Sequence, residues 1–379
     1  MIYLDYAAST PPNNQVMDSF IKVSNEFFAN NGAVHKLGSE AHNLYIKSKE
    51  QIARFLRVEI NELFFTSGAT EANNMAVKGY ALKYQTRGKH LITTKLEHPS
   101  VYEAFKQLEE FFGFEVTYLS GDENGIINPE DVRDAIRKDT ILVSILHVNN
   151  EIGAINDIET IGEIIKAHRK IGFHVDLTQT IGKIDFDIKR MNITLATFSA
   201  HKIFGLKGSG MLYKKDSVEL LPLLSGGKQQ SGVRAGTFST GHCVATAKAV
   251  RMAYQNRIQH YEYVQNIHNQ IRQRLEEVDN LVINTPKENY SPFILNFSVI
   301  NIKPETFLRA MSDDGIYLST KSACSKTRTV RSRVIESITD DEAVITTPIR
   351  LSFSHYIKMH EIDEIVTKII QNINMLRGK

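Results

Sequence analysis

The sequence has little that would mark a disulfide-bonded or zinc-binding protein. Of its 379 residues only two are cysteines, Cys243 and Cys324, and they form no CxxC pair. The histidines form no HExxH motif. Disulfide frameworks and structural zinc sites need several such residues at set spacings. We therefore expect neither a disulfide nor a bound metal, and each cysteine has to be judged by its own surroundings.

Long apolar runs and an excess of one charge are also missing. No window approaches the apolar length needed to cross a bilayer, and the first residues, MIYLDYAAST, show no cationic segment followed by an apolar one. The 45 basic and 43 acidic side chains leave a net charge of +2, which provides no general attraction to nucleic acid or anionic lipid. The sequence thus predicts a cytoplasmic protein that binds neither nucleic acid nor a membrane directly.

Short apolar runs alternate with amphipathic segments between about residue 62 and residue 215, which is typical of repeated βα units on a mostly parallel sheet. The expected strands are ELFFTSG, HLITTKLEH, EVTYL, TILVSILHV, GFHVDLTQ, LATFSAHK and GSGMLYKK. One long helix over 243–278 is expected to lead into a region of mixed strands and helices. The sequence contains no repeat, low-complexity tract or flexible linker.

Polar side chains follow five of these strands at the point where each strand ends. Ligands of open α/β sheets bind beyond the carboxyl ends of the strands. The residues at these ends are Ser67, Gly68, Ala69 and Thr70, then His98, Asn149 and Asn150, Asp176 and Gln179, and finally Ser199, His201 and Lys202. Each group alone has an ordinary interpretation as a helix cap, a turn or a loop. Asp176 is the exception, because a buried carboxylate is costly unless a cation meets it.

One cofactor requires these groups together. Pyridoxal 5'-phosphate needs a lysine to bond with, a carboxylate that keeps its pyridine nitrogen protonated, and donors around its phosphate. Lys202 and Asp176 supply the first two, and a group of three supplies the donors: Thr70, Ser199 and His201. His98 is suited to stack on the ring. Lys202, once released by a substrate, can move a proton at the substrate carbon.

These residues lie in motifs that resemble one family over essentially the whole chain. The motifs are YLDYAAST, FTSGATEANN, EHPSVYEA, VSILHVNNEIGAI, HVDLTQTIGK, FSAHKIFGLKGSG, GVRAGT and STKSACS. They resemble, in order, the signatures of the NifS/IscS-like cysteine desulfurases, which are class V aminotransferases of pyridoxal phosphate fold type I. The resemblance implies an α/β large domain, residues 15–250, with a mostly parallel seven-stranded sheet. It also implies a smaller α+β domain formed by residues 1–14 and 251–379, which carries the loop with the catalytic cysteine.

The resemblance also implies a role for each site residue. Lys202 would bond the cofactor, Asp176 would pair with its ring nitrogen, Gln179 would bind its hydroxyl group, and His98 would stack on the ring and share in catalysis. Phosphate binding is implied for Ala69, Thr70, Ser199 and His201, and Thr237 would reach the phosphate of the neighbouring subunit of a homodimer. Asn150 and Arg350 would hold the carboxylate of the substrate, L-cysteine, which suits the fork of an arginine.

Cys324 carries the distinctive chemistry of the family, in which it takes sulfur from cysteine as a persulfide and alanine is released. Basic residues near it in sequence should favour the thiolate: Lys321, Lys326, Arg328, Arg331 and Arg333. The sulfur acceptor would be an iron-sulfur scaffold or a tRNA-thiolation enzyme, and the short end of the chain after its last helix favours the latter slightly. Cys243 is expected to be a packed helix residue.

Departures from the family pattern keep other interpretations open. Leu206 replaces a usual proline and Lys321 a usual glycine before the SAC motif. A selenocysteine lyase or another class V reaction therefore remains an alternative, and so does a non-catalytic protein that retains the fold as an assembly partner.

Overall fold

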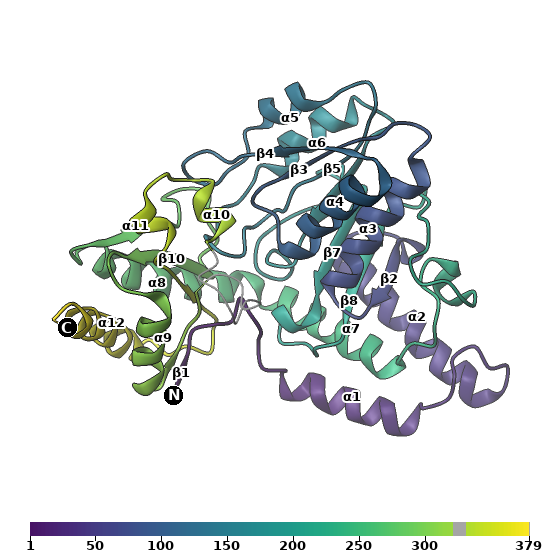
Figure 1. Ribbon diagram of the computed structural model, residues 1–379. Helices are drawn as coiled ribbons and strands as arrows, with labels where there is room; N and C mark the ends of the chain where they lie inside the picture. Colours follow the sequence, from purple (N-terminus) through teal and green to yellow (C-terminus); the bar gives the residue numbers. More distant parts are fainter. Residues whose placement is uncertain (321–330, 379) are drawn as a thin grey trace.

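A seven-stranded sheet forms the centre of the computed structural model, which describes residues 1–320 and 331–378 (Figure 1). Its strands are β2 (Leu63–Thr66), β3 (His90–Thr94), β4 (Glu115–Leu119), β5 (Thr140–Ser144), β6 (Gly172–Asp176), β7 (Leu195–Ser199) and β8 (Gly210–Lys214). Their order is β2-β8-β7-β6-β5-β3-β4. β8 runs antiparallel to β2 and β7, whereas the other neighbours are parallel. The seven predicted strands and the mostly parallel sheet are confirmed.

Helices cover both faces of this sheet, because successive strand residues point to opposite faces. Phe64 packs in one apolar cluster with α3 and α4, while Leu63 and Phe65 pack in another with α2, α6 and α7. The helices of this part are α1 (Asn14–Glu26), α2 (Lys36–Leu56), α3 (Ala69–Tyr84), α4 (Pro99–Phe112), α5 (Pro129–Ala135), α6 (Ile158–Lys166) and α7 (Thr240–Gln255). Short 3-10 turns are η1 (Ile60–Glu62), η2 (Ala200–Lys202) and η3 (Gln229–Gly232).

A second group of elements packs around its own apolar cluster, which includes Leu4, Phe297 and Ile369. Its strands are β1 (Ile2–Tyr3), β9 (Leu281–Ile283), β10 (Ile294–Val299), β11 (Ile316–Tyr317) and β12 (Pro348–Ser352). Its helices are α8 (Arg257–Leu275), α9 (Pro304–Asp313) and α12 (Glu361–Arg377). α10 (Arg333–Glu336) and α11 (Glu342–Ile345) also lie in the C-terminal half of the chain, but their buried side chains pack in the cluster that contains Leu63 and Phe65. β1 pairs with β11, and the antiparallel order of the other three strands is β12-β10-β9. Both ends of the chain therefore lie in this part (Figure 1).

The single long helix predicted over 243–278 is wrong, because the chain breaks between α7 and α8 at Asn256. The backbone there has φ −107° and ψ 6°, outside the helical range. The Asn256 side chain donates from Nδ2 to the carbonyl of Met252 at 3.0 Å. Asparagine competes in this way with regular helix hydrogen bonds, and the helical periodicity of the sequence does not reveal it.

The strand predicted from TILVSILHV also differs, since β5 ends at Ser144. The chain nevertheless continues beside β6, because Ile145 and His147 donate to the carbonyls of His174 and Asp176. In residues 1–320 and 331–378, no helix combines the length and hydropathy that a membrane crossing would require.

Candidate active site

A cavity of about 270 Å³ opens beyond the carboxyl ends of the parallel strands, and we call it the strand-end cavity. Ten of the residues predicted from the sequence line it: Ala69, Thr70, His98, Asn150, Asp176, Gln179, Ser199, His201, Lys202 and Arg350. The N-terminal segment also reaches it through Ala7 and Ala8. Short-range sequence patterns had placed most of these side chains at strand ends, and the parallel sheet brings those ends together.

Lys202 stands in the turn η2 directly after β7. Its Nζ donates to the carbonyl oxygens of Ala7 and Ala8 at 2.5 and 2.7 Å. The N-terminal segment therefore orients the amine of Lys202, which follows β7 in the chain.

Asp176 closes β6 and is 7% exposed. Its Oδ2 accepts from Asn73 Nδ2 at 2.9 Å, and its Oδ1 accepts from the Thr178 backbone N–H at 2.8 Å. Asn73 is itself held, since it donates to Ser100 Oγ at 2.9 Å and accepts from Thr197 Oγ1. A hydrogen-bond donor thus meets each oxygen and holds the carboxylate in place. The cavity therefore has a fixed acceptor suited to a protonated ring nitrogen.

His98 is the N-cap of α4, and Pro99 occupies the first helical position. Its Nδ1 accepts from the Ser100 backbone N–H at 3.1 Å, so the neutral ring carries its proton on Nε2. Burial lowers the pKa of His98, and the nearby cations Lys202 and Arg350 act in the same direction. A neutral ring with a defined tautomer thus lines the cavity.

The N-terminus of α3 and the end of β7 form one side of the cavity. Ala69 donates its backbone N–H to Ser199 Oγ at 2.6 Å. A Cβ on Gly210 would come within 2.6 Å of Gly68 Cα, so the close approach of the start of β8 to the N-cap of α3 requires glycine. Burial and neighbouring lysines lower the pKa of His201 to about 4. These are backbone and side-chain donors of the kind that hold phosphate at a helix N-terminus.

Arg350 lies in β12 with its side chain 3% exposed. Its Nη2 contacts Asp5 Oδ1 and Ser319 Oγ, both at 2.9 Å, and its Nη1 donates to the Asn150 carbonyl at 2.8 Å. Its Nε is buried with no hydrogen-bond partner among residues 1–320 and 331–378. Two of the five N–H donors of the guanidinium, one on Nε and one on Nη1, are therefore left for an anionic ligand such as a carboxylate.

Four residues of this neighbourhood were not predicted from the sequence: Asp5, Asn73, Glu97 and Lys183. Asp5 fixes Arg350, and Asn73 fixes Asp176. Burial and the nearby Asp176 raise the pKa of Glu97 well above its usual value, and its Oε1 accepts from the Leu146 backbone N–H. These residues lie within the quoted motifs, but no local pattern indicates partners that are up to 345 residues away.

One predicted site residue of the described chain, Thr237, does not line the strand-end cavity. Thr237 is exposed and borders a different cavity beside Phe28 and Phe238. Cys324 lies outside the described residues. Cys243, as predicted, is buried in α7, where burial raises the pKa of its thiol.

Two of the cations predicted to favour the Cys324 thiolate, Arg331 and Arg333, lie in the described chain. Arg331 pairs with Glu336 and with Glu342. Arg333 donates to the carbonyls of Lys95 and Glu97, both at 2.6 Å. Both guanidinium groups therefore have partners of their own, while Lys321, Lys326 and Arg328 lie outside the described residues, so the effect of these cations on Cys324 stays a prediction.

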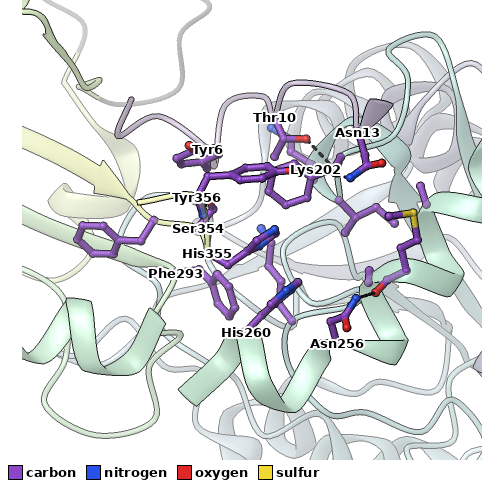
Figure 2. A pocket seen from close by; sticks show the side chains of 18 of the residues that line it. Tyr6, Thr10, Asn13, Lys202, Asn256, His260, Phe293, Ser354, His355 and Tyr356 are labelled. Carbon is purple, nitrogen blue, oxygen red and sulfur yellow. Dashed lines mark hydrogen bonds between the residues drawn. The ribbon is translucent and has the colours of Figure 1, made fainter. Parts of the chain in front are cut away.

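A second cavity of about 200 Å³ adjoins the first, because Lys202 lines both (Figure 2). We call it the adjoining cavity. Aromatic rings dominate its wall, and His260 and His355 stack there with ring centroids 3.7 Å apart. Lys183 lines it as well.

Comparisons with known proteins agree with this geometry. The family model described as aminotransferase class-V matches residues 2–365, and the chain belongs to this family. It is 37% identical to the cysteine desulfurase IscS of Stutzerimonas stutzeri in an alignment of 381 positions that covers 99% of this chain and 93% of that protein. A solved NifS-like protein has a TM-score of 0.93 at 32% identity, with 99% of this chain and 100% of that one covered. A structure described as SspA in complex with cysteine has a TM-score of 0.80 at 34% identity, with 93% of this chain and 99% of that one covered.

The cofactor of this family is pyridoxal 5'-phosphate, and the strand-end cavity fits it. The cavity offers an amine at Lys202, a hydrogen-bonded carboxylate at Asp176 and an amide at Gln179. The N-terminus of α3 is placed to bind the phosphate of the cofactor. The unpaired Nε of Arg350 is available for the carboxylate of an amino acid. These match the aldehyde, ring nitrogen, hydroxyl and phosphate of the cofactor and the carboxylate of an amino acid.

Proposed function

We propose that this protein is a pyridoxal 5'-phosphate-dependent cysteine desulfurase, which converts L-cysteine to L-alanine and leaves the sulfur as a persulfide on Cys324. The observation that carries the proposal is the single cavity lined by Lys202, Asp176 and Arg350 in a class V aminotransferase chain. The similarity to proteins named cysteine desulfurase over nearly the whole chain selects this reaction within the family.

The residues of the cavity divide into those that hold the cofactor and those that act on the substrate. Pyridoxal 5'-phosphate, when bound, withdraws electrons from the substrate carbon next to the nitrogen. Lys202 bonds the cofactor and later moves a proton at that carbon. Asp176 keeps the ring nitrogen protonated, Gln179 donates to the ring hydroxyl group, and His98 stacks on the ring and exchanges a proton through Nε2. The phosphate is held by Ala69, Thr70, Ser199 and His201.

Arg350 and Asn150 hold the substrate carboxylate. The unpaired Nε of Arg350 supports this assignment, since a carboxylate there would complete its hydrogen bonds. The Cys324 thiolate then forms a bond to the substrate sulfur while the carbon–sulfur bond breaks. The bonding pair stays with the carbon fragment, which takes up a proton and leaves as alanine.

We also propose a homodimer in which Thr237 reaches the phosphate of the neighbouring subunit. Exposed apolar side chains support a subunit interface at the turn between α1 and α2, where Phe28 is 75% and Leu37 47% exposed. Such groups on a surface often mark a contact with another chain. Light scattering of the cofactor-loaded protein should give about twice the mass of the chain.

The division into a large domain, residues 15–250, and a smaller one, residues 1–14 and 251–379, is likewise a proposal. The separate apolar cluster that joins Leu4 to Phe297 and Ile369 supports it. We further propose a cytoplasmic protein whose sulfur acceptor is a protein, either an iron-sulfur scaffold or a tRNA-thiolation enzyme. Tracing labelled sulfur from Cys324 to captured proteins distinguishes the two.

The activity is tested by incubating the cofactor-loaded protein with L-cysteine and measuring alanine and persulfide. Cys324→Ser should abolish both products, while Cys243→Ser should retain them because that thiol is buried away from the site. Lys202→Ala should lose the absorbance of the covalently bound cofactor. Alanine formation that survives Cys324→Ser would refute the persulfide step.

The same assay decides between this function and its alternatives. A kcat/KM for selenocysteine far above that for cysteine would assign the protein as a selenocysteine lyase. Protein that takes up no pyridoxal 5'-phosphate would favour a non-catalytic assembly partner.

A further inference from the structure

A buried contact behind the strand-end cavity joins Lys183 to Gln179. Lys183 Nζ donates to Gln179 Oε1 at 3.0 Å, and Gln179 Nε2 donates to the Ala7 carbonyl at 3.1 Å. Gln179 is 5% exposed and lines the strand-end cavity, whereas Lys183 lines the adjoining cavity. The contact therefore links a side chain of the strand-end cavity to one of the adjoining cavity.

This contact fixes which end of the amide faces which neighbour. An amide has an acceptor end and a donor end of nearly the same shape, so its hydrogen-bond partners decide its orientation. An ammonium only donates and a carbonyl only accepts. Lys183 therefore requires Oε1 on its side, and Ala7 requires Nε2 on the other.

The amide orientation determines what Gln179 can offer to a ligand. Nε2 carries two N–H groups, and the Ala7 carbonyl accepts one of them. The second is left for an acceptor in the strand-end cavity, such as the ring hydroxyl oxygen of the cofactor. If the amide turned over, Oε1 would face that oxygen and two acceptors would oppose each other.

Lys183 has surroundings that suit this role rather than an ion pair. No carboxylate forms an ion pair with it in residues 1–320 and 331–378, and its Nζ lies 5.6 Å from the ring centroid of Phe293. Burial, with the cationic Lys202 and Arg350 nearby, lowers the pKa of Lys183 to about 7. The neutral amine keeps N–H groups to donate to Oε1, and the Ala7 carbonyl, which can only accept, still requires Nε2 on its side, so the orientation of Gln179 persists in either protonation state.

We propose that Lys183 is a positioning residue, which orients the Gln179 amide so that it donates to the ring hydroxyl group of the cofactor. The inference rests on the proposed function, because it takes pyridoxal 5'-phosphate as the ligand. Lys183 itself does not touch the cofactor in this account.

The test is a double-mutant cycle on the dissociation constant of pyridoxal 5'-phosphate, measured by titrating the cofactor-free full chain. Lys183→Met should raise Kd about three- to tenfold, the loss expected for one hydrogen bond. Gln179→Leu should raise it by a similar factor, and the double variant should be no weaker than Gln179→Leu alone. Lys183→Arg, which keeps a donor, should restore most of the affinity.

A matched control separates positioning from stability. Lys214 is also a buried lysine, and it donates to the Val218 carbonyl at 2.7 Å at the opposite end of the sheet. Lys214→Met should lower the melting temperature without changing Kd. An unchanged Kd in Lys183→Met, or effects of Lys183→Met and Gln179→Leu that multiply in the double variant, would overturn the proposal alone. Wild-type protein that binds no cofactor would overturn the proposed function and this inference together.

Discussion

The ion pair between Asp5 and Arg350 should be one of the interactions on which the stability of the protein depends most. The pair joins a residue just after β1 to β12 at 2.9 Å, with side chains 18% and 3% exposed. Asp5 Oδ1 also accepts from Ser319 Oγ at 2.8 Å. Asp5→Ala therefore leaves a buried guanidinium without its counter-charge and a hydroxyl group without its acceptor.

The magnitude follows from these contacts. Removing one partner of a buried pair costs about 3–5 kcal/mol. Arg350 keeps its bonds to Asn150 and Ser319 and Asp5 is partly exposed, so we expect the lower end, about 3 kcal/mol. Asp5→Asn retains an acceptor oxygen, and we expect it to lose about 1 kcal/mol.

Urea unfolding of the cofactor-free protein, followed by circular dichroism, measures these losses. With a slope of about 3 kcal/mol per molar urea, Asp5→Ala should lower the midpoint by about 1 M. Glu40→Ala is the matched control, because Glu40 pairs with Lys36 on the surface with side chains 40% and 88% exposed. It should lose no more than about 0.5 kcal/mol. Equal losses in Asp5→Ala and Glu40→Ala would refute the reasoning.

Two further predictions concern other buried polar groups. Asn73→Leu leaves Asp176 Oδ2 without its donor at 2.9 Å, so it should destabilise the protein by about 2–4 kcal/mol and weaken cofactor binding. Urea unfolding measures the loss of stability, and a cofactor titration measures the loss of affinity. A loss of stability as small as that caused by Asn74→Ala would contradict the prediction. Burial lowers the pKa of His147 to about 4, so the unfolded chain binds more protons than the folded one between pH 6.5 and 4. Stability from this residue is full above pH 6.5 and falls by about 2 kcal/mol at pH 5. The drop in urea midpoint between pH 7.5 and pH 5 should be smaller in His147→Leu, and an unchanged drop would exclude this residue as its cause.

Much of the fold and most of the candidate site were accessible from the sequence because their signals are local. Five apolar runs of the sheet, among them the one that became β6, carry their polar residues directly after them. The parallel arrangement then brings Asp176 and Lys202 to one cavity, as the βα pattern predicts. Local composition did not reveal the break at Asn256, where a single side-chain hydrogen bond decides against helical periodicity.

The sequence by itself determined the succession of strands and helices along the large domain and the chemical groups available at the strand ends. Only the tertiary structure decided how those groups are held. Asn73 and Asp176 are 103 residues apart and Asp5 and Arg350 are 345 apart, so their contacts exist only once the sheet and the N-terminal segment have packed. The orientation of Gln179 likewise depends on Ala7, which is 172 residues away. Hydrogen bonds have strict geometry and short range, which is why a pattern in the chain can indicate a reactive group but not the partners that aim it.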